Sequence, residues 1–161
     1  MLSFREGVSR AVRRSFRPGG RAPRSEYWWF QLLFFGLIAA AYVVDEALGT
    51  PIVWDGSGVA LLLVMVATLP TQVTLTLRRF QDRGVNGVWG LPYALSDIIP
   101  TDRTVELIDV VGPGMVVVIG ALAILYILWG FLQTVLPSDP HANAYGPGPE
   151  GSAESVAETF S

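Results

Sequence analysis

Cysteine and lysine are absent from this chain of 161 residues, and histidine occurs once, at His141. Without cysteine the chain can form no disulfide, no thiolate metal site and no cysteine nucleophile. One histidine in a tail rich in proline and glycine cannot supply the several ligands that zinc requires. The nucleotide-binding pattern G-x-x-x-x-G-K-[ST] and the hydrolase pattern G-x-S-x-G are also missing. We therefore predict no metal site, no cofactor, no catalytic residues and no enzymatic activity.

Charged residues make up only 16% of the chain, whereas hydrophobic residues make up 51%. Three long stretches carry no charge at all, at 27–44, 59–77 and 110–136. Because a helix needs about 20 mostly apolar residues to cross a bilayer, we predict membrane spans at about 27–47, 57–78 and 110–136. A cleaved signal peptide ending near Ala39 is a competing explanation of the first run, but that run continues past this alanine.

A shorter apolar stretch, VNGVWGLPYALSDIIP at 85–100, is interrupted by glycine and proline. It fits either a short, irregular third span or a re-entrant or interfacial segment. The distribution of arginine favours the span. Arginines cluster before Tyr27 and at 78–83, whereas acids dominate the connections around 45–55 and 97–109. Because basic connections stay in the cytoplasm, four spans place both basic segments and both termini there.

The fold predicted from these observations is all-α: a polytopic membrane protein with four transmembrane helices. Residues 19–136 form the membrane domain, and residues 137–161 form a disordered cytoplasmic tail, because that tail is rich in proline, glycine, serine and acids.

The N-terminal segment 1–18 is predicted to be an amphipathic helix in the cytoplasmic interface. Ser3 and Glu6 have the spacing of a capping box, and apolar residues recur behind them at helical intervals. The arginines of this segment would contact anionic lipid headgroups. A basic arm without structure is the alternative. No nucleic acid is expected as a partner, because the segment has no motif that reads bases.

The stretch RSEYWWF at 24–30 places charges directly against large aromatic side chains. Tyrosine and tryptophan favour the headgroup level of a bilayer, and arginine extends to the phosphates. We interpret five residues as an interfacial anchor: Arg21, Arg24, Tyr27, Trp28 and Trp29.

Glu26 does not fit that interpretation, because an acid gains nothing from an anionic leaflet. In the four-span arrangement it lies at the same depth as the end of the second span. We therefore predict that Glu26 pairs with Arg78 or Arg79, and that Asp82 pairs with Arg24 or Arg83.

Thr68, Gln72 and Thr76 are spaced four residues apart, so they share one face of the second span. This polar face could hydrogen-bond to another helix or line a narrow polar path. Gly36 and Ala40 form a small-xxx-small pair, which suits either internal packing or a contact between two copies of the chain.

Three segments carry a resemblance to a known family: GRAPRSEYWWF at 20–30, RRFQDRGVNGVWG at 78–90 and NAYGPGP at 143–149. They resemble the motifs of domain-of-unknown-function family 805, whose members commonly show GRxxRSEYWWF, RR-x-HD-x-G-x-S-GWW and N-x-YGP-x-P in this order. The resemblance implies a bacterial inner-membrane protein with several helices, and it implies no particular reaction. Gln81 stands at the family's histidine position, Asn86 at its serine and Val88 at its first tryptophan. A proton-transfer or metal role for that histidine therefore cannot apply to this chain.

Three classes of function remain open. The first is a non-enzymatic structural or partner-binding subunit, which interacts with itself or with another membrane protein. The second is a component of an oligomeric channel or transporter. The third is an enzyme acting on lipid or envelope substrates, for which the only candidates are acids of the outer segment: Asp97, Asp102, Glu106 and Asp109.

Overall fold

The structure is a computed structural model that describes residues 2–53, 57–96 and 112–148. Within these ranges the regular structure is helical, and no strand is formed. The elements are α1 (Phe4–Arg13), α2 (Arg24–Leu48), α3 (Val59–Asp82), the 3-10 helix η1 (Gly87–Gly90), α4 (Leu91–Leu95) and α6 (Pro113–Val135). Of these, α2, α3 and α6 are long and apolar enough to cross a membrane. The described part of the chain is thus all-helical and contains helices of the kind found in a multi-pass membrane protein.

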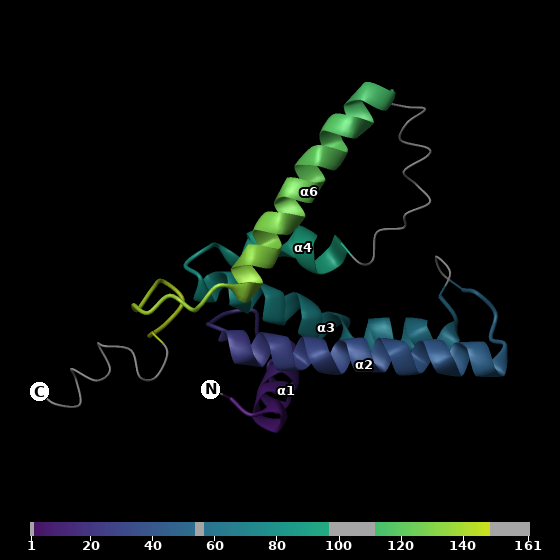
Figure 1. Ribbon diagram of the computed structural model, residues 1–161. Coiled ribbons are helices and arrows are strands. Elements are labelled where there is room, and N and C mark those ends of the chain that lie inside the picture. The colour runs from purple at the N-terminus through teal and green to yellow at the C-terminus, as the bar shows by residue number, and fades with distance from the viewer. Residues whose placement is uncertain (1, 54–56, 97–111, 149–161) are drawn as a thin grey trace, which may run out of the picture.

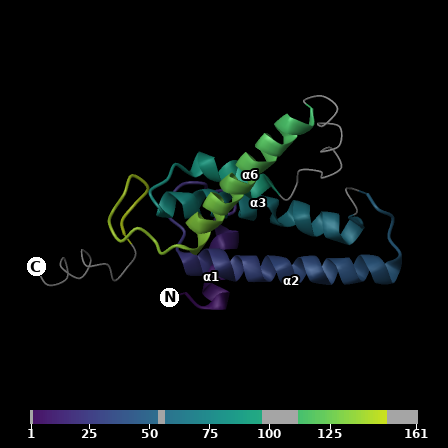
Figure 2. The same cartoon turned by 45° about the horizontal axis from the view of Figure 1, so that its top comes forward.

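α2 and α3 lie side by side and run in opposite directions (Figures 1 and 2). Their interface holds the main hydrophobic cluster, in which Tyr27, Phe30 and Phe34 of α2 lie with Leu75 of α3. Between Phe30 and Phe34 along α2, the side-chain amide of Gln31 pairs with that of Gln72 in α3, and each donates to the other, at 3.0 and 3.2 Å. The pair is therefore held by apolar packing and by one reciprocal amide contact.

Asp45, near the end of α2, caps the beginning of α3. Its carboxylate accepts hydrogen bonds from the backbone N–H groups of Ala60 and Leu61, at 2.9 and 2.8 Å, and from the hydroxyl of Thr50 at 2.5 Å. The first N–H groups of a helix have no partner within the helix, and a carboxylate satisfies them well. Asp45, read from the sequence as an outer-side acid, therefore fixes the connection between the two helices.

α1 begins with the predicted capping box: Ser3 Oγ accepts from the backbone of Glu6, and Glu6 accepts from the backbone of Ser3. The helix ends at Arg13, before the expected boundary at residue 18. It is docked on α2 through Trp29, whose ring lies edge-on to Phe4 at 5.7 Å and whose indole N–H donates to the carbonyl of Leu2. The small residue Gly7 makes room for this ring, because an added Cβ would lie 3.0 Å from it.

The predicted third span at 85–100 is described as far as Ser96. The described part consists of η1 followed directly by α4. Together they are too short to cross a bilayer, which requires about 20 helical residues. The ring of Phe80 in α3 contacts the ring of Tyr93 in this segment, with 6.3 Å between the ring centroids. It also contacts Trp129 of α6, at 5.4 Å between centroids. Several predicted features lie outside the described residues: the end of this span at 97–100, the acids Asp55, Asp97, Asp102, Glu106 and Asp109, residues 110–111 of the last span, and residues 149–161 of the tail.

α6 contacts the other helices through its C-terminal end and diverges from them toward its N-terminal end (Figures 1 and 2). Its buried residues are Gly130, Gln133 and Thr134, all in the last two turns. Most of its large apolar side chains are exposed.

Candidate functional site

α3 does not end where its apolar run ends. The second span was predicted to end at about residue 78, but α3 continues to Asp82 and contains both Arg78 and Arg79. Arg78 and Arg79 are 0% exposed, as is Glu26 of α2, and Asp82 is 2% exposed. A buried charge is tolerated only when it is paired and hydrogen-bonded. The apolar run alone therefore placed this boundary too early.

Glu26 lies between two guanidinium groups. Its Oε1 is 2.9 Å from Nη1 of Arg78, one of the two predicted partners, and its Oε2 is 3.0 Å from Nε of Arg10. Arg10 comes from α1, which docks on α2 next to Glu26, and the sequence analysis did not consider it. The periodicity of α1 contained the relevant signal, because Gly7 and Ala11 mark its packed face.

Asp82 is likewise held by two arginines, but not by those expected. Its carboxylate pairs with Arg79, three residues earlier in the same helix, and with Nε of Arg21 at 3.0 Å. The proposed partners Arg24 and Arg83 donate instead to the backbone carbonyls of Val135 and Pro137. These assignments were wrong because the end of α6, which the sequence analysis did not place here, offers carbonyl acceptors to both side chains.

The last carbonyls of α6 are satisfied by side chains from α2 and α3. The guanidinium of Arg79 donates to the carbonyls of Thr134 and Leu136. The indole N–H of Trp28 also donates to the Thr134 carbonyl, at 3.1 Å. The C-terminal end of a helix carries partial negative charge, so a cation is favourable there.

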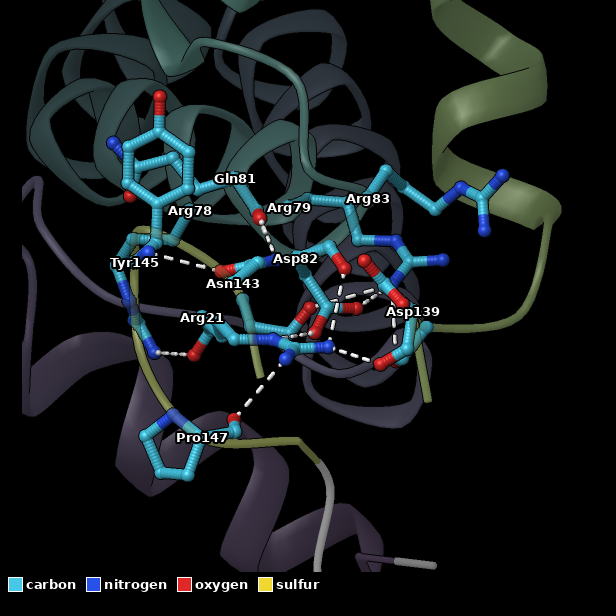
Figure 3. Close-up of polar contacts among 12 residues, drawn as sticks. Arg21, Arg78, Arg79, Gln81, Asp82, Arg83, Asp139, Asn143, Tyr145 and Pro147 are labelled. Atoms are coloured by element: carbon cyan, nitrogen blue, oxygen red, sulfur yellow. Dashed lines mark hydrogen bonds and ion pairs between the residues drawn. The ribbon is translucent and has the colours of Figure 1, made fainter. Parts of the chain in front are cut away.

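The segment after α6 is ordered over residues 137–148, which differs from the expected disorder. Arg21 donates to the carbonyls of Asp139 and Pro147 (Figure 3). It also donates to the carbonyl of His141. The backbone N–H of Asp139 donates to the carbonyl of Asp82, and the side chain of Asn143 donates to the carbonyl of Gln81 (Figure 3). Hydrogen bonds to the end of α3 thus replace the disorder that composition alone suggests.

We name the assembly of four arginines and two acids the arginine–carboxylate cluster; it consists of Arg10, Arg21, Glu26, Arg78, Arg79 and Asp82. Its parts are joined through the backbone, because Arg78 donates to the carbonyl of Arg21 and its own carbonyl accepts from the N–H of Ala22. Each carboxylate is shared by two cations. Arginine stays protonated in proteins, so this arrangement suits structural support better than proton transfer.

The residues expected to anchor the chain in the interface contact the protein extensively. Tyr27 is buried, Trp28 and Trp29 donate to backbone carbonyls, and Arg21 belongs to the cluster. Arg24 remains exposed. Their contact with lipid headgroups stays a prediction.

The polar face of α3 is divided among three kinds of contact. Gln72 pairs with Gln31 across the helix interface, whereas the hydroxyl of Thr68 donates to the carbonyl of Val64 in its own helix. Thr76 is buried. Together with Gln72 it lines a cavity between the helices.

Within the described residues, no group of three or more histidine, cysteine, aspartate or glutamate side chains is arranged to hold a metal ion. His141 lies near Asp139, with 3.6 Å between Nδ1 and Oδ1. The backbone N–H of His141 lowers the pKa of Asp139 below its ordinary value. The pair lies in the tail beside the end of α3, because the backbone N–H of Asp139 donates to the carbonyl of Asp82, but it is more exposed than the buried carboxylates.

The family model described as "Protein of unknown function (DUF805)" matches residues 15–147 of the chain. No curated protein and no solved structure matches the chain significantly. The matched region contains Arg21 and the carbonyl of Pro147, which meet in the structure through a hydrogen bond. The match covers most of the chain, and the protein therefore belongs to the DUF805 family of proteins of unknown function.

Proposed function

We propose that this protein is a bacterial inner-membrane subunit with a structural or partner-binding role rather than an enzyme. The observation that carries the proposal is the contrast between the two ends of α6. Its C-terminal end is fixed by Arg79 and Trp28. Its remaining length exposes large apolar side chains, such as Val117 and Leu125. A rigidly held apolar helix with a free face is suited to packing against a helix of another membrane protein or of a second copy.

The cluster supports this role, because its buried charges hold α1, α2, α3 and the tail together. The Gln31–Gln72 pair weighs against the alternative of an oligomeric channel, since it uses the polar face of α3 for contact between helices. An enzyme acting on lipid or envelope substrates would need acids outside the described residues.

The positions of the helix ends favour the four-span topology with both termini in the cytoplasm. α2 begins, and α3 and α6 end, at the cluster, so these three ends lie on one side of the membrane. Each of the three helices is long enough to cross it. α6 therefore begins on the other side, and the chain between Asp82 and Pro113 has to return across the bilayer. η1 and α4, the described part of the predicted span at 85–100, would form only part of this crossing.

We further propose that α1 lies in the cytoplasmic interface. Val12 and Arg13 at the end of α1 are exposed, and so is Phe16 in the turn that follows the helix. Apolar side chains next to arginines are what an anionic membrane surface binds.

Photo-crosslinking in native membranes tests the partner-binding role. A photoreactive amino acid at Val117 or Leu125 should give crosslinks to protein, which mass spectrometry would identify as a partner or as a second copy. The same residue at the buried position Gln133 is the matched control and should crosslink only within the chain. Absence of protein crosslinks from both exposed positions would contradict the proposal.

Cysteine labelling tests the topology, and the chain has no natural cysteine to interfere. Arg17→Cys and Ala142→Cys should react with an impermeant reagent from the same side of the membrane, and Ile52→Cys from the opposite side. Labelling of Ala142→Cys from the side of Ile52→Cys would exclude four spans.

A further inference from the structure

A cavity of about 460 Å³ lies between α2, α3, α4 and α6. Its floor contains the buried side chains Tyr27, Phe34 and Thr76, and its rim contains the more exposed rings of Phe35 and Phe131. It is therefore a groove that opens sideways between helices able to cross a membrane. Its volume falls in the range of sites that hold a small molecule, about 300–1,000 Å³.

The groove offers few unsatisfied polar groups to a ligand. The side chains of Gln31 and Gln72 line it, but their amides are paired with each other. The hydroxyl of Ser96, another lining residue, donates to the carbonyl of Tyr93 at 2.9 Å. The rest of the lining is largely aromatic and aliphatic, so the groove selects an apolar group.

A cation lies at the end of the groove. Arg24, Trp28, Gln31 and Phe35 follow one another along one stripe of α2, and the last three line the groove. Arg24 and Trp28 also both donate to the C-terminal carbonyls of α6, whose residue Phe131 lines the groove. The contact of Arg24 is long, at 3.4 Å to the carbonyl of Val135. A guanidinium has five N–H donors, which leaves donors of Arg24 for an anion.

We propose that this groove binds one acyl chain of an anionic phospholipid from the bilayer, with the lipid phosphate held by Arg24. The apolar lining matches the chain, the position between candidate spans gives access to membrane lipid, and the arginine matches the charge of the headgroup. This inference does not depend on the partner-binding role proposed above, because the free face of α6 lies nearer its other end.

Lipid photolabelling in nanodiscs tests the proposal. The nanodiscs would consist of phosphatidylcholine with a trace of either phosphatidylglycerol or phosphatidylcholine carrying a photoreactive acyl chain. We expect the phosphatidylglycerol probe to label peptides containing Tyr27–Phe35 and Ile127–Phe131 roughly fivefold more than the phosphatidylcholine probe, the preference expected for one arginine near an anionic group.

Two variants separate the headgroup from the chain. Arg24→Gln should reduce labelling by the phosphatidylglycerol probe to the phosphatidylcholine level. Arg83→Gln, which loses a similar contact with a carbonyl after α6 but does not line the groove, should leave it unchanged. Ala94→Trp, which fills the groove, should reduce labelling by both probes. The comparison of the two probes on the natural chain needs no variant, so it decides the matter even if a variant does not fold.

Two results would overturn the proposal. One is labelling that is as strong on the exposed face of α6 at Val117–Leu125 as in the groove, or equal for the two headgroups. The other is a photoreactive residue at Phe35 that crosslinks to another protein or a second copy instead of lipid.

Discussion

Arg78 and Glu26 form an ion pair in which neither side chain is exposed to solvent, with 2.9 Å between Nη1 and Oε1. A second cation, Arg10, reaches the other carboxylate oxygen from α1, and its side chain is 41% exposed. The pair thus links the buried ends of α2 and α3, and the outer arginine joins α1 to them.

Replacement of Glu26 by glutamine should destabilise the protein by about 3–5 kcal/mol, because it leaves the buried guanidinium of Arg78 without its counter-charge. Thermal unfolding in detergent, or the yield of folded protein, measures this effect. Arg10→Gln is the matched control and should cost much less, since Arg10 is partly solvated and exposed ion pairs contribute about 1 kcal/mol or less.

A charge exchange makes the same prediction specific to one partner. Glu26→Arg combined with Arg78→Glu should recover part of the yield lost by Glu26→Arg alone. The combination with Arg79→Glu should not, because Arg79 pairs with Asp82. Equal rescue by both combinations would refute the assignment of Arg78.

Gly58→Ala should lower the melting temperature by a few degrees. A Cβ at this position would lie 2.3 Å from Cγ of Asp45, so the carboxylate would have to leave the first N–H groups of α3. Gly36→Ala in the middle of α2 meets nothing within 4 Å and replaces glycine inside a helix, so it should leave stability unchanged or raise it. A neutral Gly58→Ala would indicate that Asp45 does not cap α3.

Gly130→Ala should separate α4 from α6. The added Cβ would lie 2.5 Å from the ring of Tyr93, and overpacking of this kind costs about 1–3 kcal/mol. Gly120→Ala on the same helix meets nothing within 4 Å and serves as the control. Unfolding curves of the two variants in detergent provide the comparison, and an unchanged Gly130→Ala curve would show that Tyr93 moves without cost.

The first turn of α1 should fray in acid. Hydrogen bonds from Ser3 lower the pKa of Glu6 below its ordinary value of 4.5, so the folded state favours the carboxylate. The stabilisation is present above pH 4.5 and is lost as the pH falls through the lowered pKa of the folded state. Hydrogen exchange of the α1 amides should accordingly lose protection in this acid range. Ser3→Ala should reduce that pH dependence; if it stays the same, Glu6 is not its source.

The features predictable from the sequence depend on local patterns. Apolar runs of sufficient length indicated α2, α3 and α6. α3, however, continues past the predicted end at residue 78 to Asp82, and hydrogen bonds hold the segment 137–148, which was expected to be disordered. Ser3 and Glu6 indicated the start of α1, since a capping box involves residues only three positions apart. The pairing of Glu26 with Arg78 or Arg79 required only matched depth and opposite charge.

The other contacts could not be predicted because they join residues distant in the chain. Arg10 reaches Glu26 only after α1 docks through Gly7 and Trp29. Arg21 finds carbonyl partners that lie more than a hundred residues later, and composition alone made that segment appear disordered. Two arginines near one aspartate are indistinguishable in sequence, so the choice of Arg21 and Arg79 for Asp82 depended on the position of the α6 end.

The hydrogen bonds from Arg21 and Arg79 to the segment after α6 also set an order of assembly. Both arginines are synthesised long before residues 134–147, which carry their carbonyl acceptors. While the chain is still being made, these side chains have Asp82 but lack the carbonyls that complete their hydrogen bonds. The ribosome has to finish nearly the whole family region before Arg21 and Arg79 have all their acceptors. A chain interrupted within α6 would therefore enter the membrane with the charges of these two arginines only partly satisfied.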